Sequence, residues 1–191
     1  IYIWEFTVFT VFAKKILKLI YFNIQALDNR ISNFGMVIKD LSTLAHLECL
    51  TLIRASLLDT SFQGLTRLES LNLIECDFEN FKNESFRFAP NIERLDIQKP
   101  ENLNDINLNE LSKFKSLILV HSGRLYELLD FKNNNLENLE FMYFNDNDFY
   151  SFDGKYISGL SNLKSLCFKS LSAVKIENIF FINLNYDFLC R

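Results

Sequence analysis

The sequence predicts an α/β solenoid, a coil of short repeated units with a parallel concave β-sheet and an irregular or short-helical convex side. Three observations support this fold class. A short apolar pattern recurs along the chain, its clear copies lie 21 to 27 residues apart, and further apolar residues follow each copy at wider spacing. No single unit of this length can bury its own apolar face, so the units must stack around a shared core.

The recurring pattern has three apolar positions, as in the segment Leu68-Glu-Ser-Leu71-Asn-Leu73. Its last two apolar residues are two apart and therefore point to the same face of a short strand. The other clear copies occupy residues 47–52, 92–97, 114–119, 136–141 and 163–168, and weaker copies occupy residues 17–22 and 179–184. Spacing in this range is typical of stacked repeats that each contribute one strand.

Each predicted strand is followed by a return segment that brings more apolar residues to the core. These are Phe78, Phe81 and Phe86 after Leu73, Leu103 and Ile106 after Ile97, and Leu125 and Leu128 after Leu119. We therefore expect a single repeat domain over residues 1–191, with about six to eight repeats.

Composition places the chain among folded proteins without a basic nucleic-acid-binding face. Of the 191 residues, 49% are hydrophobic and 15% aromatic, and only 5 are Gly. The net charge is −4 with no run of Lys or Arg, so we expect no nucleic-acid partner. The apolar segment 1–13 has no clear role, since it is too short to span a bilayer and lacks the features of a secretory signal. The chain begins with Ile, which indicates a fragment or processed form, and a membrane anchor could lie outside it.

From about Ala13 to its end, the chain resembles a leucine-rich-repeat protein. Its best copy runs from Leu68 to Phe86 and is similar to the 24-residue repeat of animal extracellular receptors, as are the segments 62–68 and 86–92. The resemblance implies a horseshoe that binds a protein through its concave strands. It also implies Asn at a turn position, where this chain has Ala55, Cys76, Pro100, Ser122 and Phe144, so an unbroken asparagine ladder is excluded.

The four cysteines are widely spaced and form no CxxC pair, which favours neither a zinc site nor a disulfide framework. This usage is typical of a reducing compartment. Cys76 is expected to be a small buried turn residue rather than a thiol ligand or nucleophile. Cys49 and Cys167 fall at concave strand positions, where we expect them to be exposed and too far apart to bridge, and Cys190 is a candidate for a truncated cap.

Sequence motifs give no support for catalysis, a cofactor or a metal. His46 and His121 are the only histidines, and neither lies in a hydrolase or zinc-protease motif. The oxygen-rich segment 145–148 departs from calcium-loop spacing at Tyr150 and Ser151, which favours a polar loop insertion. We therefore predict a non-enzymatic protein without a cofactor or a small-molecule substrate.

Binding in a solenoid is expected on the concave face, where the side chains between the core positions are exposed. Aligning the copies places Val120 beside Met142, His121 beside Tyr143 and Ile118 beside Glu140. This semi-apolar patch is the candidate protein-binding site. Its residues are Ile118, Val120, His121, Glu140, Met142 and Tyr143.

The expected function is recognition of a protein, as part of a leucine-rich-repeat receptor or secreted protein. A sequon at Asn83-Glu84-Ser85 favours an extracellular or cell-surface location. The alternative is an intracellular adaptor, such as an F-box-type substrate-recognition subunit, which the irregular repeats and unpaired cysteines would suit.

Overall fold

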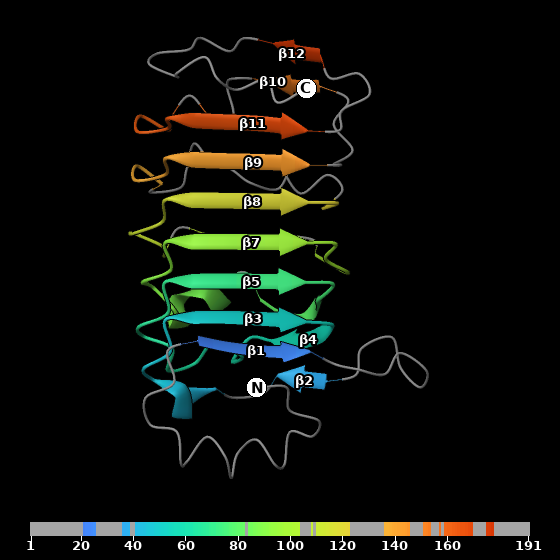
Figure 1. Cartoon of the computed structure of the whole chain (residues 1–191), viewed down its shortest axis with the longest axis vertical. Helices are drawn as coiled ribbons and strands as arrows, with labels where there is room; N and C mark the ends of the chain where they lie inside the picture. Colours follow the sequence, from blue (N-terminus) through green and yellow to red (C-terminus); the bar gives the residue numbers. More distant parts are fainter. Residues whose placement is uncertain are drawn as a thin grey trace.

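The computed structural model describes residues 21–25, 36–38, 41–82, 84–103, 108, 110–122, 136–145, 151–153, 157, 159–169 and 175–177. A parallel sheet of seven strands dominates this part of the chain, and the strands stack like rungs in Figure 1. Its order is β1 (Tyr21–Gln25), β3 (Cys49–Ile53), β5 (Ser70–Ile74), β7 (Arg94–Gln98), β8 (Ser116–Val120), β9 (Phe141–Asn145) and β11 (Ser165–Lys169). Each neighbouring pair is separated by one return segment, so the sheet is built by coiling.

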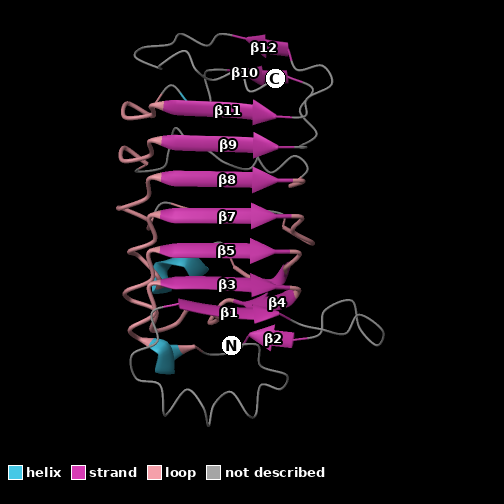
Figure 2. Cartoon of the chain, in the orientation of Figure 1, coloured by secondary structure: helices cyan, strands magenta, loops and turns pink. Residues whose placement is uncertain are grey.

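Smaller elements occupy the return segments. A three-stranded sheet joins β2 (Met36–Ile38), β4 (Ala55–Leu58) and β6 (Asp77–Asn80), and β10 (Ser151–Asp153) pairs with β12 (Lys175–Glu177). Two short 3₁₀ segments, η1 (Ser42–Leu44) and η2 (Ser85–Phe88), also lie in the return segments, as Figure 2 shows. The predicted solenoid with a parallel sheet and an irregular, short-helical return side is confirmed. The segments 1–13 and 179–184 lie outside the described residues.

Strand register confirms most of the predicted repeats and corrects one. The same core position pairs from strand to strand, from Leu50 to Leu71, Leu95 and Leu117. On the next strand, Leu117 pairs with Met142 and not with the predicted Leu139. Leu136, Leu139 and Met142 follow one another three residues apart, so the apolar pattern fits two phases equally well. The structure uses the later phase, which buries Met142 and Phe144 fully. Phe144 is therefore a core residue and not the turn residue that we expected.

The first copy is also shifted. Phe22 pairs with Leu50 and Ile24 with Leu52, so the strand lies two residues later than the predicted 17–22 pattern. Strand-forming apolar residues at both 20 and 22 allow either phase, and pairing with β3 selects the later one.

Left-handed turns end four of the strands. Arg54, Glu75, Lys99 and His121 follow directly after β3, β5, β7 and β8, and all have φ between 47° and 57°. Each donates its backbone N–H to the neighbouring strand, as Arg54 does to the Ile74 carbonyl at 2.9 Å. One residue later, Cys76 donates from Sγ to the Leu52 carbonyl at 3.4 Å, and Ser122 donates from Oγ to the Ile97 carbonyl at 3.3 Å. The side chains of Cys76 and Ser122 thus bridge adjacent repeats, at the turn position where the family that the chain resembles usually has Asn.

Phenylalanine rings fill the core beneath the return segments. Phe62 and Phe86 are fully buried and stack with their ring centroids 5.9 Å apart. Phe81 packs edge-on against Phe62, Phe78 and Phe86. The predicted inward positions of Phe78, Phe81 and Phe86 are confirmed, and Leu103 packs partly buried against the same core. Ile106, Leu125 and Leu128 lie outside the described residues.

Candidate recognition surface

The strands present three rows of side chains on the face of the sheet opposite the core. Residues at alternate positions are buried, whereas the residues between them are half-buried or exposed in β3, β5, β7, β8 and β9. The central row contains, in strand order, Thr51, Asn72, Asp96, Ile118, Tyr143 and Cys167. Neighbours within a row are about 4.8 Å apart. The rows therefore form one continuous surface, which in a horseshoe is the concave face.

Apolar side chains gather where β8 and β9 meet. Ile118 pairs with Tyr143, Ser116 pairs with Phe141, and Val120 lies on the same face of β8. We call Ile118, Val120, Phe141 and Tyr143 the apolar patch. All four are half-buried. Apolar and aromatic side chains that remain accessible on an ordered sheet have the composition of protein-binding surfaces.

The structure changes the membership of the predicted site. Met142 has no exposed surface and packs in the core, so it cannot contact a partner. Val120 pairs with Asn145 rather than Met142, and Ile118 pairs with Tyr143 rather than Glu140. The physical reason is that β9 lies three residues later in the sequence than its predicted phase. Each residue of β9 therefore pairs with a different residue of β8 than we expected. The same shift brings Phe141 onto the surface, and the alternative phase in the sequence could have revealed it.

His121 and Glu140 lie at opposite ends of the strands, His121 after the end of β8 and Glu140 before the start of β9. His121 is exposed in the left-handed turn after β8, and its backbone N–H donates to the Asn145 carbonyl at 2.9 Å. Glu140 precedes β9 and accepts from Lys164 Nζ at 2.9 Å. The expected pairing of His121 with Tyr143 is therefore wrong, and these two residues border the apolar patch at its two ends.

Asp96 lies next to the apolar patch in the central row, paired with Ile118. Gln98 Nε2 donates to its Oδ2 at 3.0 Å, while its buried Oδ1 has no hydrogen-bond partner among the described residues. Burial raises the pKa of the Asp96 carboxyl above its usual value, and the bond from Gln98 only partly opposes this.

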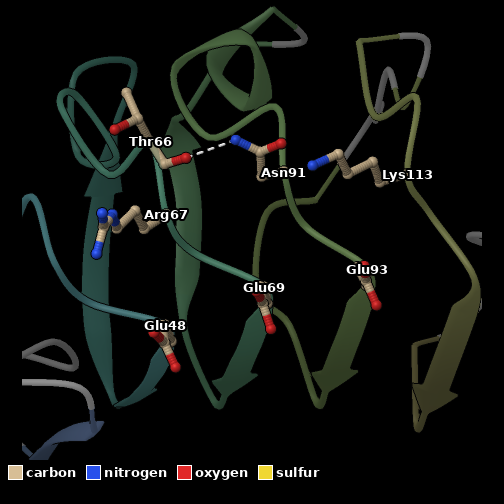
Figure 3. A pocket seen from close by; sticks show the side chains of 7 residues that line it. All are labelled: Glu48, Thr66, Arg67, Glu69, Asn91, Glu93 and Lys113. Atoms are coloured by element: carbon tan, nitrogen blue, oxygen red, sulfur yellow. Dashed lines mark hydrogen bonds between the residues drawn. The ribbon is translucent and has the colours of Figure 1, made fainter.

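A polar groove of about 280 Å³ lies beside the N-terminal ends of the neighbouring strands β3, β5 and β7. Figure 3 shows the carboxylates of Glu48, Glu69 and Glu93 along one side of it, with Arg67, Asn91 and Lys113 towards the other. Asn91 donates to the Thr66 carbonyl at 2.6 Å, and Glu93 accepts from Lys115 at 2.8 Å. Within the described part of the chain, Glu48 and Glu69 form no ion pair. The groove is suited to polar contacts at the margin of the concave face.

The cysteines occupy three different environments. Cys76 is fully buried, and burial raises its pKa to about 11, which agrees with the predicted structural turn role. Cys49 is half-buried, and burial raises its pKa as well. Cys167 is only 4% exposed, so its expected exposure is wrong. Ser165, on the same face of β11 as Cys167, is also buried. Both faces of this strand are therefore covered. Cys190 lies outside the described residues.

Other sequence features can be placed only in part. His46 is exposed. Asn145 ends β9, and the rest of the oxygen-rich segment lies outside the described residues, as does Asn83 of the sequon. Where the structure is described, no three His, Cys, Asp or Glu side chains are grouped to hold a metal ion. A search of the same residues finds no helix with the length and apolar character needed to cross a membrane.

Comparison with solved structures identifies the fold as that of leucine-rich-repeat proteins. An internalin, InlF from Listeria monocytogenes, is 21% identical, with a TM-score of 0.56 over 93% of this chain and 47% of its own. TLR13, in its complex with ssRNA13, is 17% identical, with a TM-score of 0.58 over 87% of this chain and 27% of its own. The chain thus spans about half the length of the first and about a quarter of the second. No family model and no curated protein sequence matches it. The structure of this chain is a leucine-rich-repeat solenoid with its strands on the concave face.

Proposed function

We propose that the chain is a non-catalytic recognition module that binds a protein through its concave face. The observation that carries this proposal is the apolar patch on β8 and β9. Its aromatic and aliphatic side chains lie on a rigid sheet, so binding requires little ordering of the surface. Tyr143 and Phe141 supply the large contact area that is characteristic of binding hot spots.

Charged side chains around the patch would supply specificity rather than most of the affinity. Lys115 and Glu140 directly precede β8 and β9, the two strands that carry the patch. Lys115 already forms an ion pair with Glu93, and Glu140 with Lys164. Because these pairs are exposed, a partner can compete for them at modest free-energy cost.

Site-specific photocrosslinking tests the proposal directly. A benzophenone amino acid replaces Tyr143 in the chain expressed in its source cells, and the control variant carries it at the exposed Gln63 in a return segment. We expect a protein adduct from position 143 that is absent from position 63. An adduct with RNA, equal adducts at both positions, or no adduct at 143 would contradict the proposal. The RNA outcome is included because one structural neighbour is a complex with RNA.

The proposed setting is a receptor ectodomain or secreted protein, supported by the sequon and by the resemblance of residues 68–86 to the 24-residue repeat of extracellular receptors. The measurement that decides it is glycan occupancy of Asn83 in the natively expressed protein. Ser85 of the sequon is buried in η2, between the exposed residues Glu84 and Arg87.

An intracellular adaptor is the second candidate, and the cysteines favour it. Cys49 and Cys76 carry free thiols. Free thiols are typical of proteins kept in a reducing compartment. An unmodified Asn83 in cytosolic protein would favour the adaptor over the receptor.

A further inference from the structure

Acidic charge on the strand rows is concentrated in a single residue beside the apolar patch. In the parts of β3, β5, β7, β8, β9 and β11 that face away from the core, the charged residues are Arg94, Asp96 and Lys169. Asp96 is the one carboxylate among them. It lies in the central row, immediately next to Ile118.

The neighbours of Asp96 within the fold leave its charge unmatched. On one side, Asn72 directs its amide Nδ2 away, towards Thr51 Oγ1 at 3.0 Å. On the other side, Ile118 has no donor to offer. No ion pair joins Asp96 to a cation among the described residues.

Gln98 provides the one side-chain hydrogen bond that Asp96 accepts in the described structure, at Oδ2. A half-buried carboxylate with one neutral donor and no cation is poorly compensated for the water that it has lost. The fold gains nothing evident from this arrangement, since an amide of the same shape could accept the same bond. Because Oδ1 is buried, a ligand that brings a cation would reach the carboxylate at Oδ2 and balance its charge there.

We infer that the partner presents a Lys or Arg side chain to Asp96, next to an apolar side chain that packs on the apolar patch. This inference rests on the proposed function and adds the chemistry of the partner. The row spacing of about 4.8 Å places the two contacts within reach of adjacent or alternate residues of one segment. The cation takes the place of the Gln98 amide at the carboxylate, which requires only rotation of a half-buried side chain. The net charge of −4 also favours approach of a basic segment.

A random twelve-residue peptide library displayed on phage is the probe. It is selected on the whole chain, and individual peptides are then measured against three variants. Asp96→Asn removes the carboxylate charge while keeping its shape. Glu79→Gln is the matched control, because Glu79 is an exposed carboxylate on β6, in a return segment, and forms no ion pair in the described residues. Ile118→Ala combined with Tyr143→Ala removes the apolar contact.

The expected result is a set of peptides in which Lys or Arg lies within two residues of Leu, Ile, Phe or Tyr. Asp96→Asn should weaken these peptides about 10- to 100-fold, whereas Glu79→Gln should leave them within about twofold. Equal weakening by the two charge variants would overturn the inference, because it would show only long-range attraction. Peptides without an excess of basic residues, or no selected peptides at all, would also overturn it.

The library separates failure of this inference from failure of the proposed function. Peptides that bind the Asp96→Asn variant normally but lose affinity for the Ile118→Ala/Tyr143→Ala variant would overturn only the inferred cation contact. Peptides that bind both variants as tightly as the wild type would contradict the concave patch as a binding site, and the inference with it.

Discussion

Replacing Met142 by Ala tests the repeat phase on which the surface depends. Met142 is fully buried and paired with Leu117, whereas its neighbour Phe141 is half-buried on the opposite face. Truncating Met142 removes about three methylene-sized groups, worth about 0.8 kcal/mol each, and leaves a cavity among Leu and Phe side chains. The expected loss is about 2–5 kcal/mol. For a chain of this size, that corresponds to a fall in Tm of roughly 4–20 °C.

The matched variant is Phe141→Ala, which removes the larger side chain from the other face. Because Phe141 is only half-buried, the loss should be about 1 kcal/mol, near half of the value for a fully buried Phe. Thermal unfolding followed by circular dichroism measures both, with urea unfolding as an independent check. If Phe141→Ala were as destabilising as Met142→Ala, or more so, the phase of β9 would be wrong and the apolar patch would have to be redrawn.

Three further predictions follow from local structure. Gly64→Ala should destabilise the chain by about 1–3 kcal/mol in urea unfolding, because Gly64 has φ of 83° and a Cβ would lie 2.8 Å from Ser42 Cα; an unchanged midpoint would contradict this. Asp96→Asn should raise Tm at pH 7. Burial raises the folded pKa of Asp96, so its contribution to stability is fully present below the unfolded pKa and is lost as pH rises through the folded value. The gain from Asn should therefore disappear below about pH 4, and a gain that persists there would refute this cause. Cys76, with its pKa near 11 and no exposed surface, should react with a thiol reagent at pH 8 only as fast as the chain opens, in contrast to the half-buried Cys49; equal rates for the two thiols would contradict its assignment as a structural turn residue.

The sequence is sufficient to predict the solenoid because its apolar period is long and repeated. Leu71 and Leu73 are both buried as predicted, and so is Phe86 in the return segment. These positions depend only on which residues must avoid water. Agreement over several copies makes one irregular copy unimportant for the fold class.

The details of the surface were harder to predict, because they depend on phase within a single copy. At Leu136, Leu139 and Met142, apolar residues follow at intervals of three, and hydrophobicity alone does not distinguish the strand from the residues that precede it. Pairing with β8 resolves this, because a slip would bury a different set of side chains. The unmatched charge of Asp96 was also hidden, since it depends on where Asn72 and Gln98 direct their amides.

The left-handed turns have a consequence for how such a surface can change over evolution or by design. Arg54, Glu75, Lys99 and His121 hold a backbone conformation that Gly would adopt more easily, yet each carries a long or aromatic side chain. Arg54 and Lys99 both contact Glu75, at 2.7 and 3.5 Å, so the three side chains form a chain of charge across neighbouring repeats. The turn geometry depends on backbone bonds between strands, and the side chains project outside the core. The charges of these turn side chains can therefore be changed one repeat at a time, while the spacing of the strands beneath them stays the same.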